Sequence, residues 1–215
     1  MELSYSDSEA FAIDPAAPLV IVDVDEVLAQ FMRGFGAFVG RHGFELRVDR
    51  FALFQNIYRP GETDHLDLIA GKVLFDDFFR DGADDLAPAE GAADALADLS
   101  TRAGVVILTN APEHGRVARA RWLKTHGFDY PLIINSGPKG PPAAGLAGRT
   151  TGPSVFIDDL LPQLESVAAS APGVGRFQMV TDERLRPLAP TAPDRHTRID
   201  HWPTLKTAIE ARLFA

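Results

Sequence analysis

Four short apolar runs of this sequence are each followed by side chains that can do ionic or acid–base chemistry. The set comprises two carboxylate pairs, a hydroxyl, an amide and a lysine: Asp23, Asp25, Thr109, Asn110, Lys139, Asp158 and Asp159. Four carboxylates brought together repel one another unless a cation lies among them. Oxygen ligands suit a hard divalent cation, for which we expect Mg²⁺, and they leave coordination positions open for a phosphate group.

Each of these residues also has an ordinary structural interpretation when it is taken alone. An aspartate at a strand end is often a turn residue, and a Thr-Asn pair before a helix is often its N-cap. A lone lysine in a loop is usually solvated. The functional hypothesis therefore depends on whether the fold brings these residues together.

The apolar runs are typical of strands buried on both faces of a parallel sheet. They cover residues 19–22, 105–108, 132–134, 155–157 and, as a fifth candidate, 177–180. Helical patterns alternate with them, at 28–40, 88–102, 112–126, 160–170 and 203–213. The Gly- and Pro-rich stretch 136–153 predicts a loop or broken helix, and 182–200 predicts irregular chain. This alternation predicts an α/β fold with a mainly parallel, Rossmann-like sheet, in which ligands bind beyond the carboxyl ends of the strands.

The composition excludes several classes of protein. The 215 residues are 46% hydrophobic, which is enough for a real core. They include no cysteine, which excludes a disulfide framework, a thiol nucleophile and a zinc site with cysteine ligands. The 30 acidic residues against 21 basic ones would repel a polyphosphate backbone, so we expect no nucleic-acid polymer as a partner.

The N-terminal residues lack the basic and long apolar regions of a signal peptide, and no apolar run approaches the length of a membrane helix. We therefore expect a soluble, cytoplasmic protein without a membrane partner. A homodimer is compatible with the sequence but has no support in it.

The ordered motifs resemble those of the haloacid dehalogenase (HAD) superfamily. Residues 19–28, Leu-Val-Ile-Val-Asp-Val-Asp-Glu-Val-Leu, resemble its first motif, and residues 105–110, Val-Val-Ile-Leu-Thr-Asn, resemble its second. Lys139 stands where a third-motif lysine is expected, and residues 155–159, Val-Phe-Ile-Asp-Asp, resemble the fourth motif. The order and spacing agree over residues 18–160, and this agreement is far more specific than a single Asp-x-Asp.

The resemblance implies a role for each residue of the set. Asp23 would be the nucleophile that forms an aspartyl-phosphate, and Asp25 would be the general acid and then the general base. The Thr109 hydroxyl and the Asn110 backbone would hold the phosphoryl oxygens. Lys139 would neutralise charge on the nucleophile and the phosphate.

The resemblance also implies a metal site and a type of reaction. The Asp23 carboxylate, the Asp25 carbonyl and the Asp158-Asp159 pair would hold Mg²⁺, with the direct ligand of that pair left open. Asp25 favours a phosphatase over a dehalogenase, because a phosphate ester's leaving oxygen needs a proton and a halide does not.

Glu26 departs from the motif, because most members of the superfamily have glycine after the second aspartate. We expect Glu26 to be a solvated residue where the chain leaves the core. Contact with the substrate, discrimination against highly anionic substrates, and altered activity are the alternatives.

An insert follows the first motif, since Asp25 and Thr109 lie 84 positions apart, more than a direct crossover needs. Residues 30–82 are expected to form a mostly helical cap, inserted in a core of residues 17–29 and 83–215 after a lead-in of residues 1–16. The insert contains nine of the 14 phenylalanines, which predict the core of a small helical unit with one or two rings available for stacking. A cap of this kind blocks polymers, so we expect a small phosphorylated metabolite as substrate. Residues 23–31 weakly resemble the deoxyribonucleotidase branch, which makes a nucleotide one expected ester, and a sugar phosphate is the other.

Other functions remain open at this stage. A phosphorylation-receiver domain also combines acidic residues, a threonine and a lysine, but its acidic pair and phosphoacceptor come in a different order along the chain. A phosphomutase or phosphotransferase on the same core, and a catalytically weak binding or regulatory protein, are the two alternatives that the motifs allow.

Overall fold

The computed structural model describes residues 11–215, so residues 1–10 of the predicted lead-in lie outside the described residues. A six-stranded parallel sheet runs through the molecule in the order β5-β4-β1-β6-β7-β8. Its strands are β1 (Leu19–Val22), β4 (Gly104–Asn110), β5 (Leu132–Asn135), β6 (Ser154–Asp158), β7 (Gly175–Gln178) and β8 (Thr197–Arg198). The predicted α/β class with a parallel, Rossmann-like sheet is confirmed.

Strand β1 lies inside the sheet, and none of its four residues is exposed. Val22, its last residue, pairs with Ile107 of β4 and with Ile157 of β6. The residues that follow these three positions therefore leave the sheet at nearly the same level. This register brings Asp23, Thr109 and Asp158 to one edge of the sheet.

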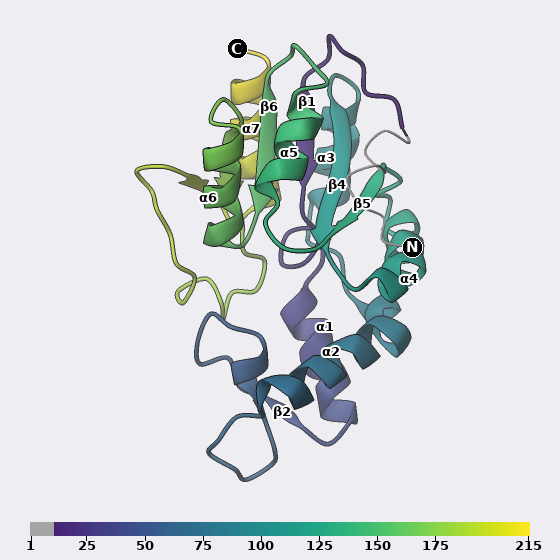
Figure 1. Cartoon of the computed structure of the whole chain (residues 1–215), viewed down its shortest axis with the longest axis vertical. Coiled ribbons are helices and arrows are strands. Elements are labelled where there is room, and N and C mark those ends of the chain that lie inside the picture. Colours follow the sequence, from purple (N-terminus) through teal and green to yellow (C-terminus); the bar gives the residue numbers. More distant parts are fainter. Residues whose placement is uncertain (1–10) are drawn as a thin grey trace.

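Helices cover both faces of the sheet (Figure 1). Val20 and Val22 of β1 belong to one hydrophobic cluster, whereas Leu19 and Ile21 belong to a second. The first cluster includes residues of α3 (Ala92–Ser100), α4 (Arg116–Thr125) and α7 (Trp202–Leu213). The second includes residues of α5 (Gly140–Ala147) and α6 (Leu161–Ser170). Side chains of β1 thus point alternately to the two faces of the sheet, and the sheet with helices on both faces forms a three-layer sandwich.

The insert, residues 30–82, lies beyond the ends of the strands, in the lower part of Figure 1. It contains α1 (Phe31–Arg41), β2 (Glu45–Leu46), a 3₁₀ turn η2 (Phe54–Asn56), β3 (Ile57–Tyr58) and α2 (Leu68–Asp81). Phenylalanine rings pack edge to face between α1 and α2, and Phe78 lies 5.4 Å from both Phe31 and Phe35, measured between ring centroids. These rings belong to the same hydrophobic cluster as Val22, so the insert and the sheet share one core.

The Gly- and Pro-rich stretch 136–153 is better ordered than its composition suggests. It contains α5, whose first turn carries Pro141 and Pro142, where a missing N–H costs nothing. Gly140 is required by packing against α6, because a Cβ there would lie 2.2 Å from the backbone oxygen of Ser166.

Smaller differences from the predicted elements occur at their ends. The helix expected at 88–102 begins only at Ala92, and the one expected at 112–126 begins as a 3₁₀ turn, η4 (Glu113–Gly115). Short β8 lies within the stretch 182–200, which was expected to be irregular. Phe11 and Ile13 of the lead-in pack against the second hydrophobic cluster. None of the helices in residues 11–215 has the length and apolar character needed to cross a membrane.

Candidate active site

Lys139 lies between two of the carboxylates identified in the sequence. Its Nζ lies 2.8 Å from Oδ1 of Asp23 and donates to Oδ2 of Asp158 at 2.7 Å. All three residues are buried. Burial alone would lower the pKa of Lys139, but the carboxylates of Asp158 and Asp23 outweigh it and raise the pKa. The lysine therefore stays cationic, and the loop residue predicted from sequence becomes part of a buried ion triad.

The position of Lys139 is set by helices α5 and α6. Lys139 is the residue that precedes α5, and its backbone N–H donates to Oε1 of Gln163 at 2.8 Å. The next N–H, of Gly140, donates to Oγ of Ser166 at 3.0 Å. Two side chains of α6 thus fix the backbone from which Lys139 reaches the strand ends.

Three carboxylates form a cluster that could hold a metal ion. Oxygens of Asp23, Asp158 and Asp159 lie within 4.8 Å of one another. Burial raises the pKa of Asp158 to about 7, against the opposing effect of Lys139. Burial and the neighbouring Asp158 raise the pKa of Asp159 well above its usual range. Such a cluster is stabilised by a divalent cation, and its all-oxygen donor set fits Mg²⁺.

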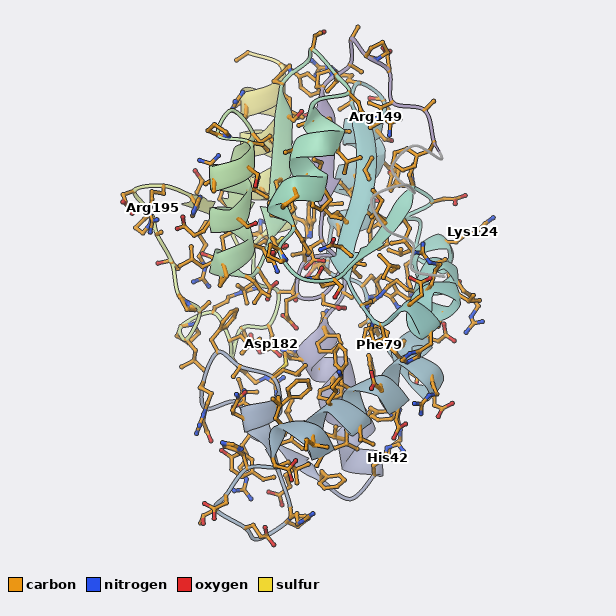
Figure 2. All side chains as sticks on the ribbon, in the orientation of Figure 1. His42, Phe79, Lys124, Arg149, Asp182 and Arg195 are labelled. Atoms are coloured by element: carbon orange, nitrogen blue, oxygen red, sulfur yellow. The ribbon has the colours of Figure 1, made fainter. Side chains whose placement is uncertain are left out.

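Asp25 is held by an arginine that sequence reasoning missed. Nη2 of Arg119 donates to Oδ1 of Asp25 at 2.7 Å and to Oδ2 at 2.9 Å. Arg119 is completely buried, and its Cζ lies 5.0 Å from the ring centroid of Phe79, which Figure 2 labels. Burial raises the pKa of Asp25, and Arg119 acts in the opposite direction; the net pKa is raised.

A signal for Arg119 was present in the sequence. Arg119 stands three and four positions before Trp122 and Leu123, which are buried on the same side of α4. An arginine in line with an apolar stripe is unusual and indicates a buried anionic partner. Nothing in the local sequence identifies Asp25, 94 positions earlier, as that partner.

The two residues of the second motif differ in their surroundings. Thr109 is fully buried, and its Oγ1 has no hydrogen-bond partner within residues 11–215. The side chain of Asn110 accepts from Asn135 and donates to the backbone oxygen of Gly137. A buried hydroxyl without a partner is costly and is available to a ligand, whereas the Asn110 side chain serves to hold the loop that leads to Lys139.

A cavity of about 200 Å³ opens above the strand ends. Its floor is polar and includes five of the sequence-predicted site residues: Asp23, Asp25, Asn110, Lys139 and Asp159. Asp158 and Thr109 are fully buried and are not part of this lining. The remaining lining residues are Glu26 and eight apolar residues, six of which come from the insert.

Comparisons with known proteins identify the architecture. No description of a known protein family matches the sequence, and no curated protein matches it. Solved structures do match over nearly the whole chain. A haloacid dehalogenase-like hydrolase of Streptococcus pneumoniae superposes with a TM-score of 0.62 at 13% identity, covering 91% of this chain and 98% of its own.

Two further structures agree with this match. The candidate HAD hydrolase YfnB of Bacillus subtilis, described as bound to magnesium, has a TM-score of 0.61 at 16% identity and covers 90% of this chain and 99% of its own. A candidate β-phosphoglucomutase of Thermotoga maritima has a TM-score of 0.57 at 15% identity, covering 91% of this chain and 100% of its own. The chain has a HAD-like fold.

Glu26, the residue that departs from the HAD motif, is not solvated as the sequence suggested. It is 3% exposed, and its Oε1 accepts from the backbone N–H of Met32 at 2.7 Å. Oε2 accepts from Oγ1 of Thr181 at 2.7 Å and from the backbone N–H of Asp182 at 2.8 Å. Asp182, labelled in Figure 2, belongs to the loop after β7, and Met32 belongs to α1. Glu26 therefore ties the first turn of the insert to the HAD-like core.

The backbone explains why glycine is usual at this position. Glu26 has φ of 59°, and it is the single non-glycine residue with positive φ in the described part of the chain. A side chain in this region is strained by about 1–2 kcal/mol. The three hydrogen bonds to its carboxylate offset this strain, which is why glutamate is tolerated here.

Proposed function

We propose that the protein is a Mg²⁺-dependent phosphatase that hydrolyses a small phosphomonoester, with a nucleotide or sugar phosphate as the substrates suggested by the sequence. One observation carries the proposal: Lys139 lies between Asp23 and Asp158, beside the third carboxylate of Asp159, at the floor of a pocket. A carboxylate neutralised by a lysine can approach a phosphate dianion that would otherwise repel it.

In the first step, an oxygen of Asp23 attacks phosphorus, and the P–O bond to the leaving group breaks. Asp25 gives its proton to the leaving oxygen. The raised pKa of Asp25, which burial causes, favours the protonated form that this step needs. The buried hydroxyl of Thr109, which has no hydrogen-bond partner among residues 11–215, is suited to hold a phosphoryl oxygen once the ester is bound.

In the second step, water attacks the phosphorus of the aspartyl-phosphate. Asp25 takes a proton from this water, the P–O bond to Asp23 breaks, and phosphate leaves. The carboxylate of Asp23 and the protonated Asp25 are restored. Arg119 faces both oxygens of Asp25 and holds its carboxylate next to the cavity between the two proton transfers.

The metal has its ligands among the same residues. The carboxylates of Asp23, Asp158 and Asp159 and the backbone oxygen of Asp25 would hold Mg²⁺. When bound, the ion supplies positive charge that brings the phosphate and the nucleophile together. We also propose that the insert, residues 30–82, acts as a cap that closes the cavity and excludes water and polymers.

Release of inorganic phosphate from a panel of small phosphomonoesters tests the proposal, with and without Mg²⁺. Asp23→Asn should abolish turnover, and Asp129→Asn, which changes an aspartate that is 78% exposed, should leave it intact. Loss of turnover on removal of Mg²⁺ is also expected. Turnover that survives Asp23→Asn would overturn the mechanism. A folded, Mg²⁺-loaded protein inactive on every ester would favour a binding or regulatory role instead.

A phosphotransferase is the second candidate, and the candidate β-phosphoglucomutases among the structures of this fold favour it. Transfer would differ only in the second step, in which an alcohol instead of water attacks the aspartyl-phosphate. Adding alcohols to the same assay distinguishes the two, because transfer yields a new ester at the expense of inorganic phosphate.

A further inference from the structure

The upper lining of the cavity is apolar throughout. The side chains that the insert contributes contain no N–H or O–H group: Phe31, Met32, Phe51, Ala52, Leu53 and Phe75. Leu160 and Leu185 extend the same surface on the side of the core. We call these eight residues the roof. A leaving group bound under the roof meets carbon and a thioether sulfur, and no side-chain donor or acceptor.

The charges of the lining are confined to the floor. Lys139 is the one cationic residue among the described residues that line the cavity, and it already faces Asp23 and Asp158. The floor also carries Asp25 and Asp159, and the oxygens of Glu26 are engaged by backbone and hydroxyl donors. The floor can neutralise the charge of one phosphate group when one divalent cation is bound. A second anionic group on the substrate would find no further cationic side chain among the described lining residues.

The size of the cavity sets a further limit. About 200 Å³ is smaller than the roughly 300–1,000 Å³ typical of sites for drug-sized ligands. This volume suits a short alkyl group or a single ring. The hydroxyls of a sugar would lose water under the roof without gaining side-chain partners, which penalises their binding.

From this lining we infer that the substrate is the phosphate monoester of a small, uncharged, apolar alcohol or phenol, in preference to a sugar phosphate or a nucleotide. The inference rests on the proposed phosphatase function for its chemistry. It concerns the roof, however, whereas the proposed function concerns the floor. The two can therefore fail separately.

Benzyl phosphate and glucose 6-phosphate give a matched test, because both are esters of primary alcohols and differ in the polarity of the leaving group. With the Mg²⁺-loaded full chain, kcat/KM should be roughly 10- to 100-fold higher for benzyl phosphate, as expected when one partner leaves polar groups unpaired. Equal values, or a preference for glucose 6-phosphate, would overturn the inference.

Two substitutions in the insert test whether the roof causes the preference for benzyl phosphate over glucose 6-phosphate. Leu53 is half-buried and lines the cavity, whereas Ile69 is 79% exposed on α2 and does not line it. Leu53→Ser should lower the ratio of the two kcat/KM values about tenfold, and Ile69→Ser should leave the ratio unchanged. An equal response of both variants would place the preference outside the roof. Comparing the Tm of both variants with that of the unchanged chain shows whether each is folded.

A binding measurement separates failure of this inference from failure of the proposed function. Acetyl phosphate, whose leaving group is small, tests the floor alone. If neither it nor any ester is hydrolysed, the phosphatase is excluded, and calorimetry with benzylphosphonate and the phosphonate analogue of glucose 6-phosphate still tests the roof. Tighter binding of benzylphosphonate by tenfold or more supports the inference. Equal binding, or tighter binding of the sugar analogue, overturns it.

Discussion

The floor and the roof of the cavity are built in opposite ways. The floor gathers ionisable groups at the ends of parallel strands, where Lys139, Asp23 and Asp159 are each less than a tenth exposed. The roof is a set of apolar side chains backed by phenylalanine rings packed edge to face between α1 and α2. The buried charges of the floor need partners of opposite sign, whereas the roof depends mainly on shape and apolar area.

This difference implies that the floor and the roof tolerate substitutions to different degrees. A change of charge on the floor leaves a buried ion without a partner, which is among the most destabilising changes in a protein. If the proposed function holds, a change among the roof residues should alter which leaving group is accepted and leave the phosphate chemistry in place.

Lys139→Met should have the largest effect. It removes the cation between Asp23 and Asp158 and leaves three buried carboxylates facing one another. We expect a fall in kcat of about 10²–10³ and a loss of about 3–5 kcal/mol in the free energy of unfolding. Steady-state kinetics and urea denaturation measure the two effects.

Lys124→Met is the matched control for that variant. Lys124, labelled in Figure 2, is 75% exposed and lies 4.0 Å from Asp129. An exposed pair of this kind contributes about 1 kcal/mol or less. If both lysine variants lost similar stability, the floor would not be the charge-sensitive region that we describe.

Arg119→Met should have an intermediate effect on catalysis. Without the guanidinium, the carboxyl of Asp25 loses the partner that holds it beside the cavity. We expect kcat for benzyl phosphate to fall about 10- to 100-fold, which is less than the roughly 10²–10⁴ that a general acid contributes. Arg121→Met, at an exposed arginine of the same helix, is the control.

The leaving group distinguishes a positioning role of Arg119 from a purely structural one. 4-Nitrophenyl phosphate needs little protonation of its leaving oxygen, so its turnover should respond much less to Arg119→Met. Arg119→Lys should recover part of the loss with benzyl phosphate. Equal losses with both esters would indicate that Arg119 serves the fold alone.

Glu26→Gly should have the smallest effect, because the stability lost with the hydrogen bonds is partly offset by the relief of backbone strain. It removes three hydrogen bonds, one to the insert at Met32 and two to the loop after β7, and it relieves the positive φ. We expect a net loss of about 1–2 kcal/mol in the free energy of unfolding. Glu26→Ala keeps the strain and should lose about 1 kcal/mol more. A Glu26→Gly protein as stable as the unchanged chain, in urea denaturation, would contradict the role of Glu26 as a tie.

The sequence was enough to predict that the charged residues at the strand ends lie close together, and physical reasons explain why. Buried parallel strands are short apolar runs, and the residues after them meet at one edge of the sheet whatever the connections are. Asp23, Lys139 and Asp158 could therefore be placed together from their positions alone. The position of Lys139 could be predicted without predicting α5, whose Gly- and Pro-rich composition is untypical of a helix.

The parts that were missed depend on contacts between distant segments. Arg119 meets Asp25 across 94 positions, and Glu26 meets Thr181 across 155. The solvated side chain expected for Glu26 was the wrong interpretation. Two of its three hydrogen-bond donors are backbone N–H groups, which any sequence could supply, and the third is the hydroxyl of the distant Thr181. The residues of the roof could not be predicted from the sequence either. The nine phenylalanines of the insert predicted an apolar core, but they did not indicate which of them line the cavity.

The close approach of α5 and α6 has a consequence for reading mutational scans. Gly140 has no side chain to touch a substrate, yet any Cβ there would meet Ser166 and displace the backbone that carries Lys139. In a mutational scan that measures activity alone, substitutions of Gly140 would be as harmful as substitutions of the aspartates at the strand ends. Scoring activity together with protein abundance would separate Gly140, which fails by loss of folded protein, from Asp23, which fails by loss of chemistry.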